Sequence, residues 1–222
     1  MPEFFYRPIY DDQHRLFPRV GGRLVKGPPM QKGLRESLLC LTCERQLARH
    51  EKYVCEMLFG GTSIMYTNHG DRIEVTGLDY LSVRLCYLSV LWRLSVATDK
   101  AWRMVQLGRH EERLRFMIRA DNPGEPTEYG FFCAVPVFEG AHSPDFILGP
   151  DYIRADVGRY YRMILAGVIT VFFVSKEPIP KKYRHLVVSR EGRWVIPFVD
   201  AARVPFILEE AKRVEMATRN EH

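Results

Sequence analysis

The segment over residues 80–98 carries apolar side chains around most of a helical circumference, and this pattern constrains the fold more than any other. Asp79 stands directly before it, and aspartate favours the start of a helix. A helix that is apolar nearly all round is stable only when other elements cover it. The pattern therefore predicts a central, buried helix. Its apolar positions include Leu81, Leu85, Leu88, Val90, Leu91, Trp92 and Leu94.

Helical patterns also occur before and after this segment. The first covers residues 43–59 and stops at Gly60 and Gly61, because glycines end helices. Two shorter helices, separated at Gly108, are expected over 101–107 and 109–119. Near the C-terminus, Asp200 is expected to cap a closing helix over 201–218.

The rest of the chain shows strand patterns. Residues 15–25 indicate two short strands about a turn at Gly21 and Gly22, and residues 72–75 indicate another strand. Beyond a loop at 122–126 the apolar period shifts towards two, and Val, Ile, Tyr and Phe become frequent, which favours β-structure. The strands expected there are 131–138, 159–165, 169–174, 185–188 and 194–198.

These patterns predict an α+β fold with three consecutive regions. Residues 1–62 contain a small knuckle and the first helix, and residues 63–122 form a helical region. Residues 123–222 form a mostly antiparallel sheet with a C-terminal helix. We expect the second and third regions to pack as one compact unit.

Composition is that of a globular protein, because 46% of the 222 residues are hydrophobic and 27% are charged. No apolar run is long enough to span a membrane, and the N-terminus lacks the basic-then-apolar order of a secretory signal. We therefore expect a cytoplasmic protein that does not bind membranes. The net charge of +5 permits contact with nucleic acid without requiring it, because acidic and basic residues are interspersed.

Cys40 and Cys43 are separated by two residues at the start of the first predicted helix, which is the spacing of half a zinc site. Two such thiolates can hold one side of a tetrahedral zinc ion, but a closed site needs four ligands. His14 is the best third ligand, because its segment is expected to fold across the knuckle. His50 lies about 10 Å along the helix from Cys43, too far for zinc bonds of about 2.0–2.3 Å. The alternative, which the missing ligands favour, is a pair of reduced structural cysteines.

The stretch over residues 32–53, KGLRESLLCLTCERQLARHEKY, resembles a family of largely uncharacterised bacterial and phage proteins with a degenerate HNH-like, treble-clef zinc module. Similar motifs continue at 77–80, 88–93 and 107–115. The resemblance implies a treble-clef-like N-terminal region and a role related to phages or to defence against them. In that family a Cys-x-x-Cys pair and a Ser-His-Ile-Ile-Pro segment precede this portion. Residues 1–4 match the end of that segment, and the cysteines and histidine are missing.

The missing residues bear directly on catalysis. An HNH nuclease needs a histidine to activate water and ligands to hold a divalent metal. The position after Cys43, where such nucleases often carry histidine, is Glu44. The resemblance therefore assigns no catalytic residue here. Either the start of the chain has been assigned too late, or the metal site has decayed.

Arg45, Arg49 and Lys52 recur at three- and four-residue spacing on the first helix. Cations at this spacing share one helix side and suit a row of phosphates, so they are candidate nucleic-acid-binding residues. The alternative is an ordinary solvated surface on which the glutamates of the same helix neutralise them. Mixed charge favours this alternative.

Arg93 lies inside the predicted buried helix, where a charged group needs a partner. Glu111 or Glu112 in the following helix can supply that partner, and His110 can join the network. The favoured interpretation is a structural salt bridge between helices. A buried group of this composition also suits phosphate recognition.

Three functions follow from these features. The preferred one is a non-catalytic binding or regulatory protein that acts on nucleic acid or on a protein partner, with zinc as its possible cofactor. The second is a metal-dependent HNH-type nuclease whose missing ligands lie upstream of the given start. The third is a structural or assembly subunit.

Overall fold

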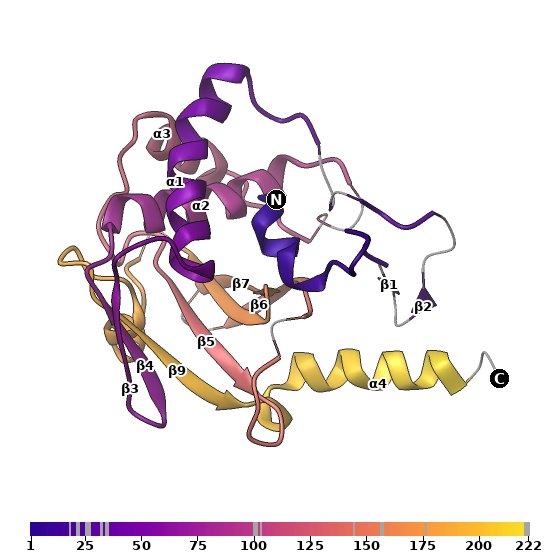
Figure 1. Cartoon of the computed structure of the whole chain (residues 1–222). Coiled ribbons are helices and arrows are strands. Elements are labelled where there is room, and N and C mark those ends of the chain that lie inside the picture. The colour runs from indigo at the N-terminus through magenta and orange to yellow at the C-terminus, as the bar shows by residue number, and fades with distance from the viewer. Residues whose placement is uncertain are drawn as a thin grey trace.

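The protein has an α+β fold, as predicted (Figure 1). The computed structural model describes the chain except for residues 18, 21, 22, 25–27, 32, 34, 35, 100, 101, 103, 144, 156, 157, 176 and 220–222. Three helices form a layer on one side of a large sheet, and a fourth helix lies at the opposite end of the molecule. The three are α1 (Leu41–Phe59), α2 (Tyr80–Val96) and α3 (His110–Arg119).

The sheet has seven strands in the order β3-β4-β9-β5-β8-β7-β6. β5 and β9 are parallel, and the other neighbouring pairs are antiparallel. Because β4 pairs with β9, hydrogen bonds join the expected helical region directly to the C-terminal sheet. The strands are β3 (Met65–Asn68), β4 (Arg72–Thr76), β5 (Phe131–Val137), β6 (Leu148–Ala155), β7 (Gly158–Leu165), β8 (Val168–Val174) and β9 (Trp194–Asp200).

Alternation of side chains along the central strands creates two separate apolar cores, one on each face of the sheet. Phe131 of β5 faces the helical layer and belongs to the larger core. Its neighbours Phe132 and Ala134 face the other side and belong to the smaller core. That side is covered by η3 (Lys181–Leu186) and by the start of α4 (Pro205–Arg219).

α2 is the central helix of the larger core, and its predicted burial is confirmed. Every side chain from Ser82 to Leu94 is buried. It packs between α1 on one side and α3 on the other. Any polar group on this helix must therefore find its partners inside the protein.

Arg84 of α2 is fully buried, and the two terminal nitrogens of its guanidinium donate to backbone carbonyls rather than to a carboxylate, while its Nε has no hydrogen-bond partner among the described residues. It donates hydrogen bonds to the carbonyl oxygens of Pro123 (3.0 Å), Glu125 (3.0 Å), Glu128 (2.6 Å) and Tyr129 (3.2 Å). Burial lowers the pKa of the guanidinium. Because all four acceptors belong to the loop between α3 and β5, Arg84 fixes that loop against α2.

The N-terminal segment lies beside the helical layer (Figure 1). It contains η1 (Glu3–Ile9), from which Phe5 enters the larger core. β1 (Arg19–Val20) and β2 (Arg23–Leu24) pair antiparallel, so the two expected short strands are confirmed. The expected turn residues Gly21 and Gly22 lie outside the described residues.

Several predictions of local structure are wrong at prolines and sheet edges. Residues 185–188 are not a strand, because η3 follows Pro180 and only Val187 makes a β-bridge. Asp200 caps η4 (Ala201–Arg203) by accepting from the Ala202 N–H, and α4 begins only at Pro205. Proline favours the first position of a helix, so it starts a new one there.

β3 and β6, at the two edges of the sheet, were not predicted. β3 is exposed along its whole length and so shows no apolar alternation. β6 contains Gly149 and Pro150, which strands tolerate mainly at edges. Of the helix expected over 101–107, residues 101 and 103 lie outside the described part, and 104–107 form no helix. No helix in the described part of the chain is long and apolar enough to cross a membrane.

Candidate functional site

The cysteine pair lies at the surface where α1 begins. Cys40 is the exposed N-cap residue, and Cys43 is partly exposed in the first turn. The backbone N–H of Cys43 donates to the Cys40 sulfur and lowers the pKa of that thiol. The hydrogen bond with Cys40, followed by partial burial, raises the pKa of the Cys43 thiol. The two thiols therefore lie together, as half of a zinc site requires.

The structure does not bring His14 to these thiols. Its ring stacks on Tyr10 with centroids 3.9 Å apart, and its Nε2 lies 3.4 Å from Oε1 of Glu3. Within the described ranges, no three His, Cys, Asp or Glu side chains lie close enough together to hold a metal ion. Cys40 and Cys43 thus have no third ligand there, and a structural zinc site needs four.

The three predicted phosphate-binding residues lie on one exposed side of α1. Arg45, Arg49 and Lys52 are all exposed. Arg49 pairs with Oδ2 of Asp121, and Nζ of Lys52 lies 3.7 Å from Oε1 of Glu56. No carboxylate among the described residues pairs with Arg45. We call this set of three residues the basic stripe.

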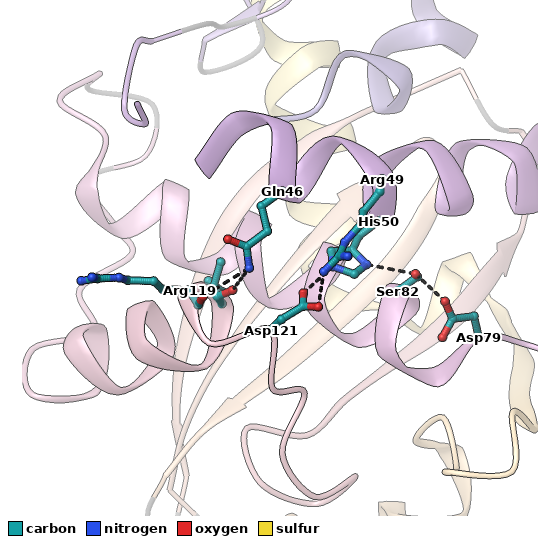
Figure 2. Close-up of polar contacts among 8 residues, drawn as sticks. Gln46, Arg49, His50, Asp79, Ser82, Arg119 and Asp121 are labelled. Atoms are coloured by element: carbon teal, nitrogen blue, oxygen red, sulfur yellow. Dashed lines mark hydrogen bonds and ion pairs between the residues drawn. The ribbon is translucent and has the colours of Figure 1, made fainter. Parts of the chain in front are cut away.

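Two glutamates of α1 do not neutralise the basic stripe. Oε1 of Glu51 lies 2.6 Å from Nη2 of Arg93 on α2, and Glu44 lines a pocket between α1, α2 and the N-terminal segment. Arg119, at the end of α3, lies against α1 through its backbone, because its carbonyl oxygen accepts from the Gln46 amide at 3.2 Å. Figure 2 shows the Arg119 side chain extended away from Asp121.

A buried histidine forms a polar network beneath the basic stripe (Figure 2). His50 is 1% exposed; its Nδ1 lies 3.0 Å from Oγ of Ser82, and its Nε2 lies 2.8 Å from Oδ1 of Asp121. The Ser82 hydroxyl donates to Oδ2 of Asp79 at 2.6 Å. From the sequence, His50 was considered only as a metal ligand, and no pattern pointed to Asp79, Ser82 and Asp121 as its network partners. The network ties α1, the start of α2 and the loop after α3 together.

Asp121 reaches His50 because of the way α3 ends. The Asp121 N–H donates to the Ile118 carbonyl, and the Asn122 N–H donates to the Met117 carbonyl. This is a Schellman motif, with Asp121 at the left-handed position (φ 54°) that glycine usually occupies. From α1, the Gln46 amide also donates to the last α3 carbonyls. Asp121 is therefore held in an uncommon backbone conformation that directs its carboxylate at α1.

The protons of this network do not fit a serine nucleophile. The single hydroxyl proton of Ser82 is donated to Asp79, so Ser82 has no proton left to give to Nδ1 of His50. Nε2 of His50 lies 2.8 Å from Oδ1 of Asp121, and Nε of Arg49 approaches the same nitrogen at 3.3 Å. A catalytic serine instead gives its proton to a neutral histidine, and Ser82 is only 5% exposed.

The predicted network of Arg93, His110 and Glu111 is not formed as expected. Arg93 pairs with Glu51, as described above, because α1 rather than α3 packs on that side of α2. Nδ1 of His110 instead lies 3.0 Å from the Tyr129 hydroxyl, and Glu111 accepts from the Ser95 hydroxyl at 3.2 Å. The prediction that Arg93 forms a structural salt bridge between helices holds, but its partner was wrong.

Comparison of the chain with protein-family models, with curated proteins and with solved structures finds no match. The function therefore rests on the geometry of the chain itself.

Proposed function

We propose that this protein is a non-catalytic binding protein and that its ligand is nucleic acid, contacted through the basic stripe. One observation carries the proposal: Arg45, Arg49 and Lys52 share one exposed side of a helix. Two of the acids that accompany them in the sequence, Glu44 and Glu51, are turned to the pocket side. Lys and Arg side chains in such a row meet consecutive phosphates and position a protein on a nucleic-acid backbone.

The network beneath the stripe supports this proposal. Asp121 holds Arg49 by its Nη2, while His50 holds Asp121 from below. A side chain that is fixed before binding loses less conformational entropy when the ligand arrives. We infer that the network serves to position Arg49 and that it performs no chemistry on the ligand.

We propose that the cysteine pair derives from an HNH-like zinc module that has lost its function. Cys40 and Cys43 lie together at the start of α1, which fits the resemblance of this segment. Figure 1 shows the β1–β2 hairpin apart from α1, and β2 contacts α4 instead. A phosphodiester-cutting centre requires a metal and a histidine near it, so we expect binding without cleavage.

The proposal is tested by fluorescence anisotropy with labelled DNA and RNA, using the double variant Arg45→Glu/Lys52→Glu. Reversing two phosphate contacts should weaken binding at least about tenfold. The matched control is Lys212→Glu/Arg213→Glu, which changes the net charge equally on exposed positions of α4. The control should bind nearly as the wild type does.

Three results would overturn this function. Equal losses in both double variants would show that only net charge matters, and not the basic stripe. If the protein bound neither DNA nor RNA, the expected ligand of the basic stripe would become an acidic protein partner. Cleavage of the labelled strand by the purified protein with added divalent metal would establish the nuclease alternative.

A further inference from the structure

Cys40 and Cys43 lie at the surface within the first turn of α1, at a spacing that allows their sulfurs to bond. The Glu44 N–H donates to the Cys40 carbonyl at 2.9 Å, so Cys40 closes that turn as the N-cap residue. Helix geometry places Cα atoms three residues apart at about 5 Å. Disulfides join Cα atoms that are about 4.4–6.8 Å apart. The backbone of α1 therefore already holds these two free thiols at the spacing of a disulfide.

The two thiols differ in the way that thiol–disulfide exchange requires. Cys40 is exposed, whereas Cys43 is only partly exposed. The N–H and the thiol of Cys43, together with the N–H of Thr42, lower the pKa of the Cys40 thiol. The contact with Cys40 raises the pKa of the Cys43 thiol. An exposed thiolate at a helix N-terminus suits the first attack on a disulfide, and a protonated neighbour suits the second.

The other three cysteines lack this combination of exposure and spacing. Cys86 and Cys133 are buried, and burial raises the pKa of both thiols, that of Cys133 to about 12. Cys55 is partly exposed, but the axis of α1 rises about 18 Å between positions 43 and 55. Cys55 is therefore a control thiol on the same helix.

We propose that Cys40 and Cys43 are a redox-active dithiol whose substrates are small disulfides such as oxidised glutathione. The Cys40 thiolate attacks one sulfur of the substrate, which forms a mixed disulfide and releases one small thiol. The Cys43 thiol then loses its proton and attacks the Cys40 sulfur, which releases the second small thiol and closes the Cys40–Cys43 disulfide. Two electrons thus pass from the pair to the substrate. This activity does not depend on the basic stripe.

The proposal is tested by mixing the full-length reduced protein with oxidised glutathione at neutral pH, alkylating the remaining thiols and digesting with trypsin. Residues 36–45 form one tryptic peptide, ESLLCLTCER, which contains both cysteines of the pair and no other. Mass spectrometry of the wild type and of the control Cys55→Ser should show this peptide without its two thiol hydrogens and without bound glutathione. Dithiothreitol should restore both thiols.

Two variants separate the roles of the two thiols, with circular dichroism to check the fold. Cys43→Ser cannot close the disulfide, so it should stop at a mixed disulfide with one glutathione on Cys40. Cys40→Ser keeps only the less exposed thiol, which should react at least about tenfold more slowly.

Three results would overturn the proposal. Glutathione on both cysteines without ring closure would show that the thiols do not act as a pair. Reaction of Cys55 in the wild type as fast as that of Cys40 would show that the start of α1 confers no special reactivity. A peptide 36–45 that keeps both thiols free in excess oxidised glutathione would show that the pair is structural.

Discussion

The two sides of α1 separate charges that alternate in the sequence. One side carries the basic stripe, and Asp121 holds Arg49 in place there. The other side turns Glu44 and Glu51 towards the pocket, where Arg93 of α2 takes the Glu51 carboxylate. A mixed run of charges is usually an ordinary solvated surface. Here the tertiary partners on α2 and after α3 divide it into two surfaces, one that carries the basic stripe and one that turns glutamates to the pocket.

The largest effect on stability is expected on the pocket side. Glu51→Ala leaves the buried Arg93 without a counter-charge, and this should lower the free energy of unfolding by about 2–4 kcal/mol. Glu44→Ala is the matched control, because Glu44 is exposed at the same pocket and should cost less than about 0.5 kcal/mol. Urea denaturation measures both. Similar losses in the two variants would show that the Glu51–Arg93 pair adds nothing beyond a surface charge.

A smaller effect is expected on the basic side. Asp121→Asn keeps a residue that tolerates the left-handed conformation but removes the charge that Arg49 and His50 contact. The loss of stability at neutral pH should be about 1–2 kcal/mol. Asp121→Gly serves as a control, because glycine fits the same backbone without any carboxyl group. If Asp121→Gly were as stable as the wild type, the carboxylate would have no structural role.

The Asp121 variants should also respond to pH. Partial burial raises the pKa of the Asp121 carboxyl group, but the hydrogen bonds from Arg49 and His50 outweigh it, so the pKa is lowered. The folded-state pKa is then below the unfolded value, and the stabilisation is present above the unfolded pKa. It should be lost as the pH falls below about 4. Denaturation of the wild type and of Asp121→Asn across this range should therefore converge in acid, and a constant difference would contradict this cause.

The smallest effect is expected at the cysteine pair, which lies near both surfaces. The double variant Cys40→Ser/Cys43→Ser should change the free energy of unfolding by less than about 0.5 kcal/mol, because both residues are surface positions without a third metal ligand in the described part of the chain. EDTA should leave the melting temperature of the wild type unchanged. Stoichiometric zinc in the purified protein, lost in the variant together with stability, would contradict this prediction.

The sequence was a good guide where one periodic pattern decided the structure. The apolar circumference of α2 predicted its burial, and the shift of period and the composition beyond residue 126 predicted the strand β5. Edge strands were missed for a physical reason: β3 buries neither face, so selection for alternating apolar side chains is absent there. Prolines explain the errors at η3 and α4, because they favour local turns and helix starts over continued strands or helices.

The site was predicted only where its residues share one helix. The basic stripe follows from the spacing of Arg45, Arg49 and Lys52, which a helix converts directly into one side. The partners of His50 come from positions 32 and 71 residues away, and no local pattern joins them. The partner predicted for Arg93 was Glu111 or Glu112 of the following helix, whereas the packing of α1 against α2 brings Glu51 to it. A charged residue in an apolar helix thus predicted a buried ion pair but did not identify the partner residue.

The central claim is that α1 binds phosphates through its basic stripe, and the salt dependence of binding tests it most directly. Affinity for a labelled DNA duplex should be measured between about 50 and 200 mM salt, where each phosphate contact contributes about −0.9 to the logarithmic slope. The three cations of the stripe predict a slope of about −2 to −3, reduced by the variant Arg45→Glu/Lys52→Glu. Binding that is independent of salt, or a slope that the variant leaves unchanged, would contradict the claim.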